Sequence, residues 1–348
     1  MAMWCHKNEY LYLYSFCFIT KGINRILLVD TCQQNVYLLP VKSLSFFELI
    51  SKYTVADIYR KISVDETPYM DDFVDFVIKN ELGRFVKDIA LFPKIEEVWD
   101  EPCLIKKAII DYRNIFHDFK KIFVQLSDLG CRSVEIRCYN GFSMRDIEVV
   151  SDSLSGDSIR NLVLILPYIE LTKSVREKID QIIVQSHHRM FFFFYSVPIN
   201  EAEKIKLFPE YIKSNIKFNS KEIKGCSDCG VVDVDKFSVP NLQQYMEYKL
   251  YNSCLNRLIS IDEMGEIKNC PSFDFSYGNI NHTALVDVVK NARYQSYWLI
   301  NKDLIEGCCD CEFRIICKDC RAYICDRSNI YSKPLKCKYN PYEKENTR

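Results

Sequence analysis

The cysteines of the C-terminal third are the residues whose type and spacing most directly predict chemistry. Nine of the 17 cysteines fall within residues 254–337. Four of them are spaced as Cys308-x2-Cys311-x5-Cys317-x2-Cys320. Two thiols three residues apart can reach one metal ion or cluster from a single tight turn, and later thiols complete the ligand set. The spacing therefore predicts a thiolate metal centre.

Two further cysteine pairs precede this segment. Cys226 and Cys229 form another Cys-x2-Cys, followed directly by glycine, which fits either a metal knuckle or an ordinary surface turn. Cys254 and Cys270 lie at the two ends of a hairpin that we expect to turn at Gly265. All four thiols are candidate metal ligands.

Charge and hydropathy indicate which partners and which cellular compartment to expect for a protein with these thiols. The chain has 46 basic and 47 acidic residues, so no strong field favours nucleic acid or an anionic membrane as a partner. Its longest apolar run, Met190 to Val197, is too short to span a bilayer, and its first residues do not read as a secretory signal. We therefore expect a cytoplasmic protein with reduced thiols, which favours metal ligation over disulfides.

The elements before the cysteines fall into two groups. In residues 1–92, strands are predicted around Lys21-Gly22 and at Asn35–Pro40, and Thr54 and Pro68 mark helix starts. A module of this order and size resembles a winged helix. It can bind an extended peptide on a free sheet edge, or serve only as a structural cap on the next domain.

Residues 103–225 alternate between predicted strands and helices, which indicates a parallel sheet covered by helices, as a partial barrel or an open sheet. Polar residues follow the strands, at Asp111, Arg113, Glu170 and Tyr195, but neither a phosphate-binding glycine loop nor a nucleophile elbow is present. We assign no catalytic residue and no organic cofactor site here. The pair His187-His188 reads as a solvated helix end.

The whole cysteine pattern resembles the SPASM domain, which follows the barrel of many radical S-adenosylmethionine enzymes that modify ribosomal peptides. The pattern is Cys254-x10-Gly265-x4-Cys270, then the four-cysteine segment, then Cys337. The end of the chain is similar to the SPASM-domain peptide maturases of grasp-with-spasm systems, which work with an ATP-grasp ligase and a short precursor peptide. The domain order, 1–92, 103–225 and a SPASM domain over 226–348, fits the same family.

The resemblance implies one or two [4Fe–4S] clusters. Carried over by position, one cluster has the ligands Cys308, Cys311, Cys317 and Cys337. The other has Cys254, Cys270 and Cys320, with Cys226 or Cys229 as the fourth. For the charged residues between these cysteines, Arg314, Asp319 and Arg321, we expect hydrogen bonding and charge balance around the thiolates.

One feature of radical enzymes is missing. They need Cys-x3-Cys-x2-Cys after the first barrel strand, so that one iron stays open for S-adenosylmethionine. Here the corresponding residues run from Asp111 to His117 without a cysteine, and the motif occurs nowhere in the chain. We therefore expect a degenerate radical-enzyme-like barrel that does not use S-adenosylmethionine.

These features predict an α/β maturation protein for a ribosomally made peptide, with iron–sulfur clusters, a leader peptide and an ATP-grasp ligase as partners, and neither nucleic acid nor a membrane. Whether the chain catalyses a reaction by itself stays open. Two alternatives remain: a catalytically active radical enzyme with an unconventional cluster site, and a zinc-stapled scaffold, because zinc and iron–sulfur sites share thiolate spacing.

Overall fold

The computed structural model describes residues 6–113, 117–154 and 158–343. The chain forms two compact units. The first combines Met1–Trp99, Val232–Ser253 and Ile300–Arg348, and the second combines Asp100–Val231 with Cys254–Leu299. Residues 226–348, which we expect to form one cysteine domain, thus contribute to both units.

The N-terminal part of the first unit has strands followed by helices, as predicted, and a last strand closes the module. Thr54 caps the helix after it, accepting a hydrogen bond from the Asp57 amide at 3.3 Å, and Pro68 stands in the first turn of the next helix. The elements are β1 (Tyr10–Leu13), β2 (Cys17–Lys21), β3 (Arg25–Asp30), β4 (Asn35–Pro40), α1 (Ser43–Ile50), α2 (Val55–Lys61), α3 (Thr67–Lys79) and β5 (Gly83–Val86).

The antiparallel sheet β2-β3-β4 is packed on both faces. Ile26 and Leu28 of β3 point into a core with α1, α2 and α3. Leu27 and Val29 alternate to the opposite face, where they meet α7 (Leu242–Leu250) and a 3-10 turn at Glu312–Ile315. This alternation follows from the period of two in a strand, and it places β3 directly between the N-terminal helices and the cysteine-rich segment.

The second unit is built on a seven-stranded sheet, mostly parallel, in the order β10-β9-β8-β7-β6-β11-β12. This confirms the predicted α/β class. The strands are β6 (Lys107–Tyr112), β7 (Ser133–Cys138), β8 (Asn161–Pro167), β9 (Met190–Tyr195), β10 (Ile216–Phe218), β11 (Leu258–Ile261) and β12 (Ile267–Lys268). The predicted hairpin after Cys254 exists as β11–β12, and β11 also pairs in parallel with β6, which extends the sheet.

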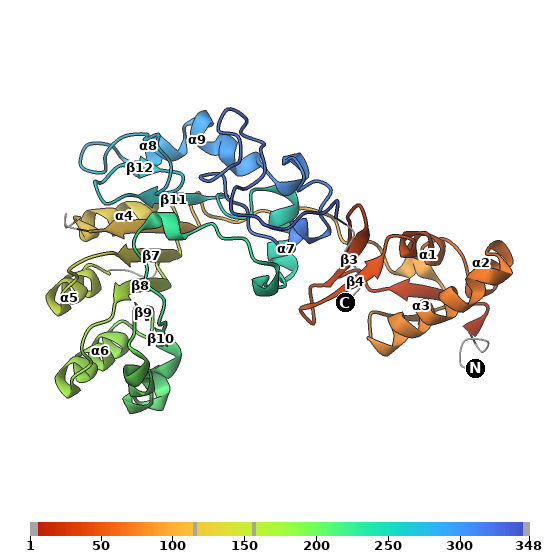
Figure 1. The fold of residues 1–348 in the computed structure, drawn as a ribbon, viewed down its shortest axis with the longest axis horizontal. Helices are drawn as coiled ribbons and strands as arrows, with labels where there is room; N and C mark the ends of the chain where they lie inside the picture. Colours follow the sequence, from red (N-terminus) through yellow and green to blue (C-terminus); the bar gives the residue numbers. More distant parts are fainter. Residues whose placement is uncertain (1–5, 114–116, 155–157, 344–348) are drawn as a thin grey trace. The chain divides into compact units, whose positions relative to one another are not determined.

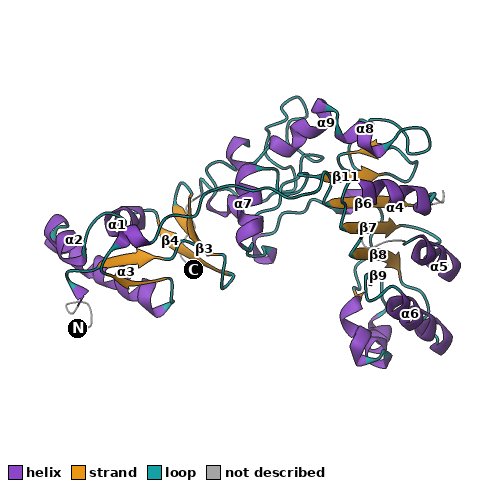
Figure 2. Cartoon of the chain, turned by 180° about the vertical axis from the view of Figure 1, so that it is seen from behind, coloured by secondary structure: helices purple, strands orange, loops and turns teal. Residues whose placement is uncertain are grey.

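Three helices cover one face of this sheet: α4 (Phe119–Asp128), α5 (Met144–Ser153) and α6 (Lys173–Gln185), as Figures 1 and 2 both show. They form the largest apolar core with alternate strand residues such as Val134, Ile136 and Cys138. The segment Ile199–Leu207, which follows β9, is a 3-10 helix. Two short helices, α8 (Leu285–Val289) and α9 (Ala292–Ser296), follow β12. No helix within the described residues is long and apolar enough to cross a membrane.

Candidate metal centre

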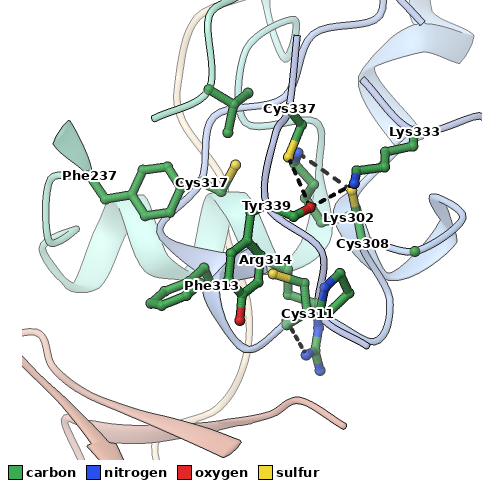
Figure 3. Close-up of a pocket in the computed structure, with 13 residues that line it drawn as sticks. Phe237, Lys302, Cys308, Cys311, Phe313, Arg314, Cys317, Lys333, Cys337 and Tyr339 are labelled. Carbon is green, nitrogen blue, oxygen red and sulfur yellow. Dashed lines mark hydrogen bonds between the residues drawn. The ribbon is translucent and has the colours of Figure 1, made fainter. Parts of the chain in front are cut away.

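Four cysteines of the predicted ligand set line one cavity in the first unit. The side chains of Cys308, Cys311, Cys317 and Cys337 border a small cavity that is partly open to solvent (Figure 3). The wall is completed by Val232, Phe237, Lys302, Gly307, Phe313, Arg314, Lys333, Tyr339 and Pro341. The structure therefore brings Cys337 to the three cysteines of the sequence-local segment.

Tight turns position the first three thiols. The amide of Cys311 donates to the carbonyl of Cys308 at 3.0 Å, and the amide of Cys317 donates to the carbonyl of Phe313 at 2.9 Å. Gly307 enters the first turn with φ +67°, a conformation that favours glycine. Short loops of this kind hold thiols in place without a long helix or strand.

Cys337 comes to the cavity on a separate segment. Its amide donates to the carbonyl of Pro334 at 3.1 Å, and it forms a parallel bridge with Val232. Its position thus depends on tertiary packing within the unit.

Burial keeps the thiols of Cys308, Cys311 and Cys317 protonated in the absence of metal. It raises the pKa of Cys311 to about 12 and of Cys317 to about 11, and it also raises the pKa of Cys308. A metal must therefore displace protons when it binds these sulfurs, as is general for thiolate centres.

The donor set fits an iron–sulfur cluster. Among the described residues, no group of three or more Cys, His, Asp or Glu side chains has the geometry that holds a single metal ion. In a four-iron cluster each thiolate binds a different iron, whereas all four sulfurs of a zinc site converge on one atom. Thiolates are ligands in both kinds of centre, so the four cysteines are compatible with an iron–sulfur cluster.

The charged residues between the cysteines hold the loop together. Arg314 donates through Nη1 to the carbonyls of Cys311 at 2.9 Å and Lys21 at 2.6 Å. Arg321 and Asp319 bind each other through two contacts, of 2.5 and 2.9 Å, and both are buried. These contacts agree with the hydrogen bonding expected from the sequence.

The β2–β3 turn lies against the same loop. Ile23 donates its amide to the carbonyl of Asp310 at 3.0 Å, and Asn24 Nδ2 donates to the carbonyl of Pro341 at 2.8 Å. A Cβ added at Gly22 would stand 2.8 Å from the backbone nitrogen of Glu312, so only glycine fits there without displacement. The sequence predicts a strand turn at Lys21-Gly22, but nothing in the sequence connects this turn with the cysteines.

The second predicted ligand set is divided between the units. Cys226, Cys229, Cys254 and Cys270 belong to the second unit, and Cys320 belongs to the first. Cys320 is not among the residues that line the four-cysteine cavity. A second cluster on these residues stays a prediction.

The polar strand ends of the large sheet are mostly engaged with neighbours. Arg113 Nε donates to Glu263 at 2.6 Å, and the Tyr195 hydroxyl donates to the carbonyl of Cys138 at 2.9 Å. Asp111 is buried, and desolvation raises its pKa to about 7. Glu170 is exposed.

The two histidines behave as the sequence analysis expects. His187 and His188 are exposed directly after α6, with φ values of 53° and 59°. They form the turn that ends the helix.

Comparison with known proteins identifies no family for this chain. No family model matches the sequence, and no curated protein matches it significantly. Among solved structures, the crystal structure of Streptococcus suis SuiB bound to precursor peptide SuiA is similar over 91% of this chain and 95% of that chain. The sequence identity is 11% and the TM-score is 0.31. A TM-score of this size does not establish a common fold, so the function below is argued from the residues.

Proposed function

We propose that this chain is a maturation protein for a ribosomally synthesised peptide. It binds the leader of the precursor on the β2-β3-β4 sheet, holds an iron–sulfur cluster on Cys308, Cys311, Cys317 and Cys337, and acts with an ATP-grasp ligase that modifies the peptide. In this proposal the N-terminal module is a winged-helix-like recognition element, and residues 226–348 are a SPASM-type domain.

One observation carries the proposal: the four cysteines of the predicted cluster surround one cavity, and the sheet proposed to bind peptide contacts the loop that bears them. Thiolates are the ligands that iron–sulfur clusters use, and the neighbouring apolar walls from Phe237 and Phe313 limit access of water. When bound, the cluster supplies a structural cross-link, a one-electron carrier or an iron for a substrate group.

The proposed peptide-binding site is the edge strand β4. Within the described sheet β2-β3-β4, β4 pairs with β3 on one side, and its other side is an edge. Val36 and Leu38 on one face of β4 are 37% and 43% exposed, although both are apolar. An extended peptide could add main-chain hydrogen bonds to this edge and cover these two side chains.

The residues after β6 support a role outside radical chemistry. Asp111, at the end of this strand, is buried, and His117 is bonded through Nε2 to the Asp111 carbonyl at 3.0 Å. In the sequence, residues 111–117, where the radical motif would lie, include no cysteine. The structure describes residues 111–113 and 117 of this segment. Reductive cleavage of S-adenosylmethionine is therefore not part of the proposal.

Anaerobic purification followed by iron and sulfide counting tests the cluster. We expect about four irons per chain for one cluster, with broad visible absorbance. Cys311→Ser should lose this iron. Cys309→Ser is the matched control, because Cys309 is exposed and outside the cavity wall, and it should retain the iron. Zinc in place of iron, or equal iron in both variants, would contradict the proposal.

A further inference from the structure

A buried lysine lies beside the four cysteines. Lys302 is 4% exposed, and its Nζ lies 3.9 Å from the Cys308 sulfur (Figure 3). The same ammonium lies 3.4 Å from Asp319 Oδ1. The sequence carries no signal for this position, because a lysine outside any motif is normally a surface residue.

Asp319 is held in place from several sides. Arg321 binds both of its carboxylate oxygens, and Asn252 Nδ2 donates to Oδ2 at 2.7 Å. Ser253 Oγ accepts from the Asp319 amide at 2.8 Å and donates to the carbonyl of Cys317 at 3.2 Å. The lysine is thus positioned by a network that also grips the cysteine loop.

The charges of this network do not balance among its three members. Lys302 and Arg321 contribute two positive charges and Asp319 contributes one negative charge, and all three side chains are buried. Arg321 Nη1 donates to the carbonyls of Ile330 and Ser332, at 2.9 and 2.8 Å. A structural ion pair needs only one cation for one carboxylate.

The surplus positive charge faces the thiols. The Lys302 ammonium has Asp319 on one side, at 3.4 Å, and the Cys308 sulfur on the other, at 3.9 Å. An uncompensated buried cation is costly. Four thiolates around a cluster carry net negative charge, which would compensate it.

We propose that Lys302 is the positioning residue that stabilises the reduced, more negative state of the four-cysteine cluster by donating a hydrogen bond to the Cys308 thiolate. The inference rests on the proposed function, since it requires an anionic centre on these cysteines. Hydrogen bonds and positive charge near cluster sulfurs make addition of an electron easier. They also slow the release of metal, because they stabilise the thiolate against protonation.

The test is a redox titration of the anaerobic holoprotein with dithionite, followed by electron paramagnetic resonance. Lys302→Met should shift the midpoint potential to more negative values, and it should speed iron loss to a chelator about tenfold or more. Lys302→Arg should restore most of both properties. Lys79→Met is the control: Lys79 is exposed at the end of α3 and does not line the cavity, so its removal should change neither property.

If Lys302→Met does not fold, Lys302→Gln removes the charge but can still donate to Asp319, and it should show the same negative shift. If the parent protein binds iron, but the methionine and glutamine variants have the same midpoint potential and the same rate of iron loss as the parent, this inference alone is overturned. A parent that binds no iron overturns the proposed function. The two failures are therefore distinguishable.

Discussion

Arg25, the first residue of β3, clamps the buried carboxylate of Glu312, the residue after Cys311. Its Nε and Nη2 lie 2.9 and 2.8 Å from Glu312 Oε1, and the Tyr339 hydroxyl donates to the same oxygen at 2.7 Å. Two contacts from one guanidinium fix both distance and orientation. The sheet proposed to bind peptide and the loop that bears the cysteines are thus joined by a specific, largely buried ion pair.

Removing the arginine should cost more than neutralising the carboxylate. Arg25→Met leaves the buried Glu312 charge without its cation, and we expect a loss of about 1–3 kcal/mol in unfolding free energy. Glu312→Gln should cost less, because the Arg25 side chain is 25% exposed and water can solvate it. Urea unfolding measures both.

Arg60→Met is the control for this comparison, because the Arg60–Asp57 pair is exposed and should contribute almost nothing. If Arg25→Met is as stable as Arg60→Met, the clamp does not stabilise the unit.

Removing the metal should loosen both the cysteine loop and the β2–β3 turn. Their contacts include the hydrogen bond from the Ile23 amide to the Asp310 carbonyl, so disorder in the loop releases this amide. Hydrogen–deuterium exchange before and after chelation should become faster at Ile23, Cys311 and Cys317. Buried β7 amides, such as those of Val134 and Ile136, should not change. Equal exchange at the turn with and without metal would refute the coupling.

The β4 edge should decide peptide affinity. Replacing Val36 and Leu38 together by lysine removes two apolar side chains that a bound strand would cover. At about 1 kcal/mol each, this weakens binding by about tenfold or more. Fluorescence anisotropy with a fluorescently labelled leader peptide measures the change. Val64→Lys is the control, because Val64 is 88% exposed and outside the sheet. Equal affinities of parent and double variant would place the peptide elsewhere.

Asp111 should make stability depend on pH. Burial raises its pKa from 3.8 to about 7 in the folded chain, so the folded state favours the protonated carboxyl. The raised pKa adds to the free energy of unfolding. This added stability is fully present below pH 3.8 and is lost as pH rises to about 7. Asp111→Asn does not titrate. Its stability relative to the parent should therefore rise by about 2–4 kcal/mol between pH 4 and pH 8.

Thermal unfolding of parent and Asp111→Asn at both pH values checks this sign. The carbonyl-stretch band of the protonated carboxyl, absent from the variant, reports the titration directly. A band that disappears well below pH 6 would contradict the raised pKa.

The sequence by itself determined what depends on near neighbours along the chain. Cys308, Cys311 and Cys317 fall within ten residues, so tight turns decide where their thiols point, and spacing alone predicts a shared centre. The helix starts at Thr54 and Pro68 and the alternating strands of the α/β sheet are equally local, since caps and periodicity act over a few residues.

Only the tertiary structure decided which residues from distant parts of the sequence lie beside the cysteine loop and join the strands. Cys337, which the sequence predicts as a ligand only through the family resemblance, reaches the cavity by packing against Val232. Lys302 faces Cys308 because it pairs with Asp319, which Asn252 holds in place. Pairing of β11 with β6, and the clamp of Arg25 on Glu312, join residues more than 100 positions apart. Such contacts depend on the shape and charge of folded surfaces, and no periodicity or spacing along the chain encodes them.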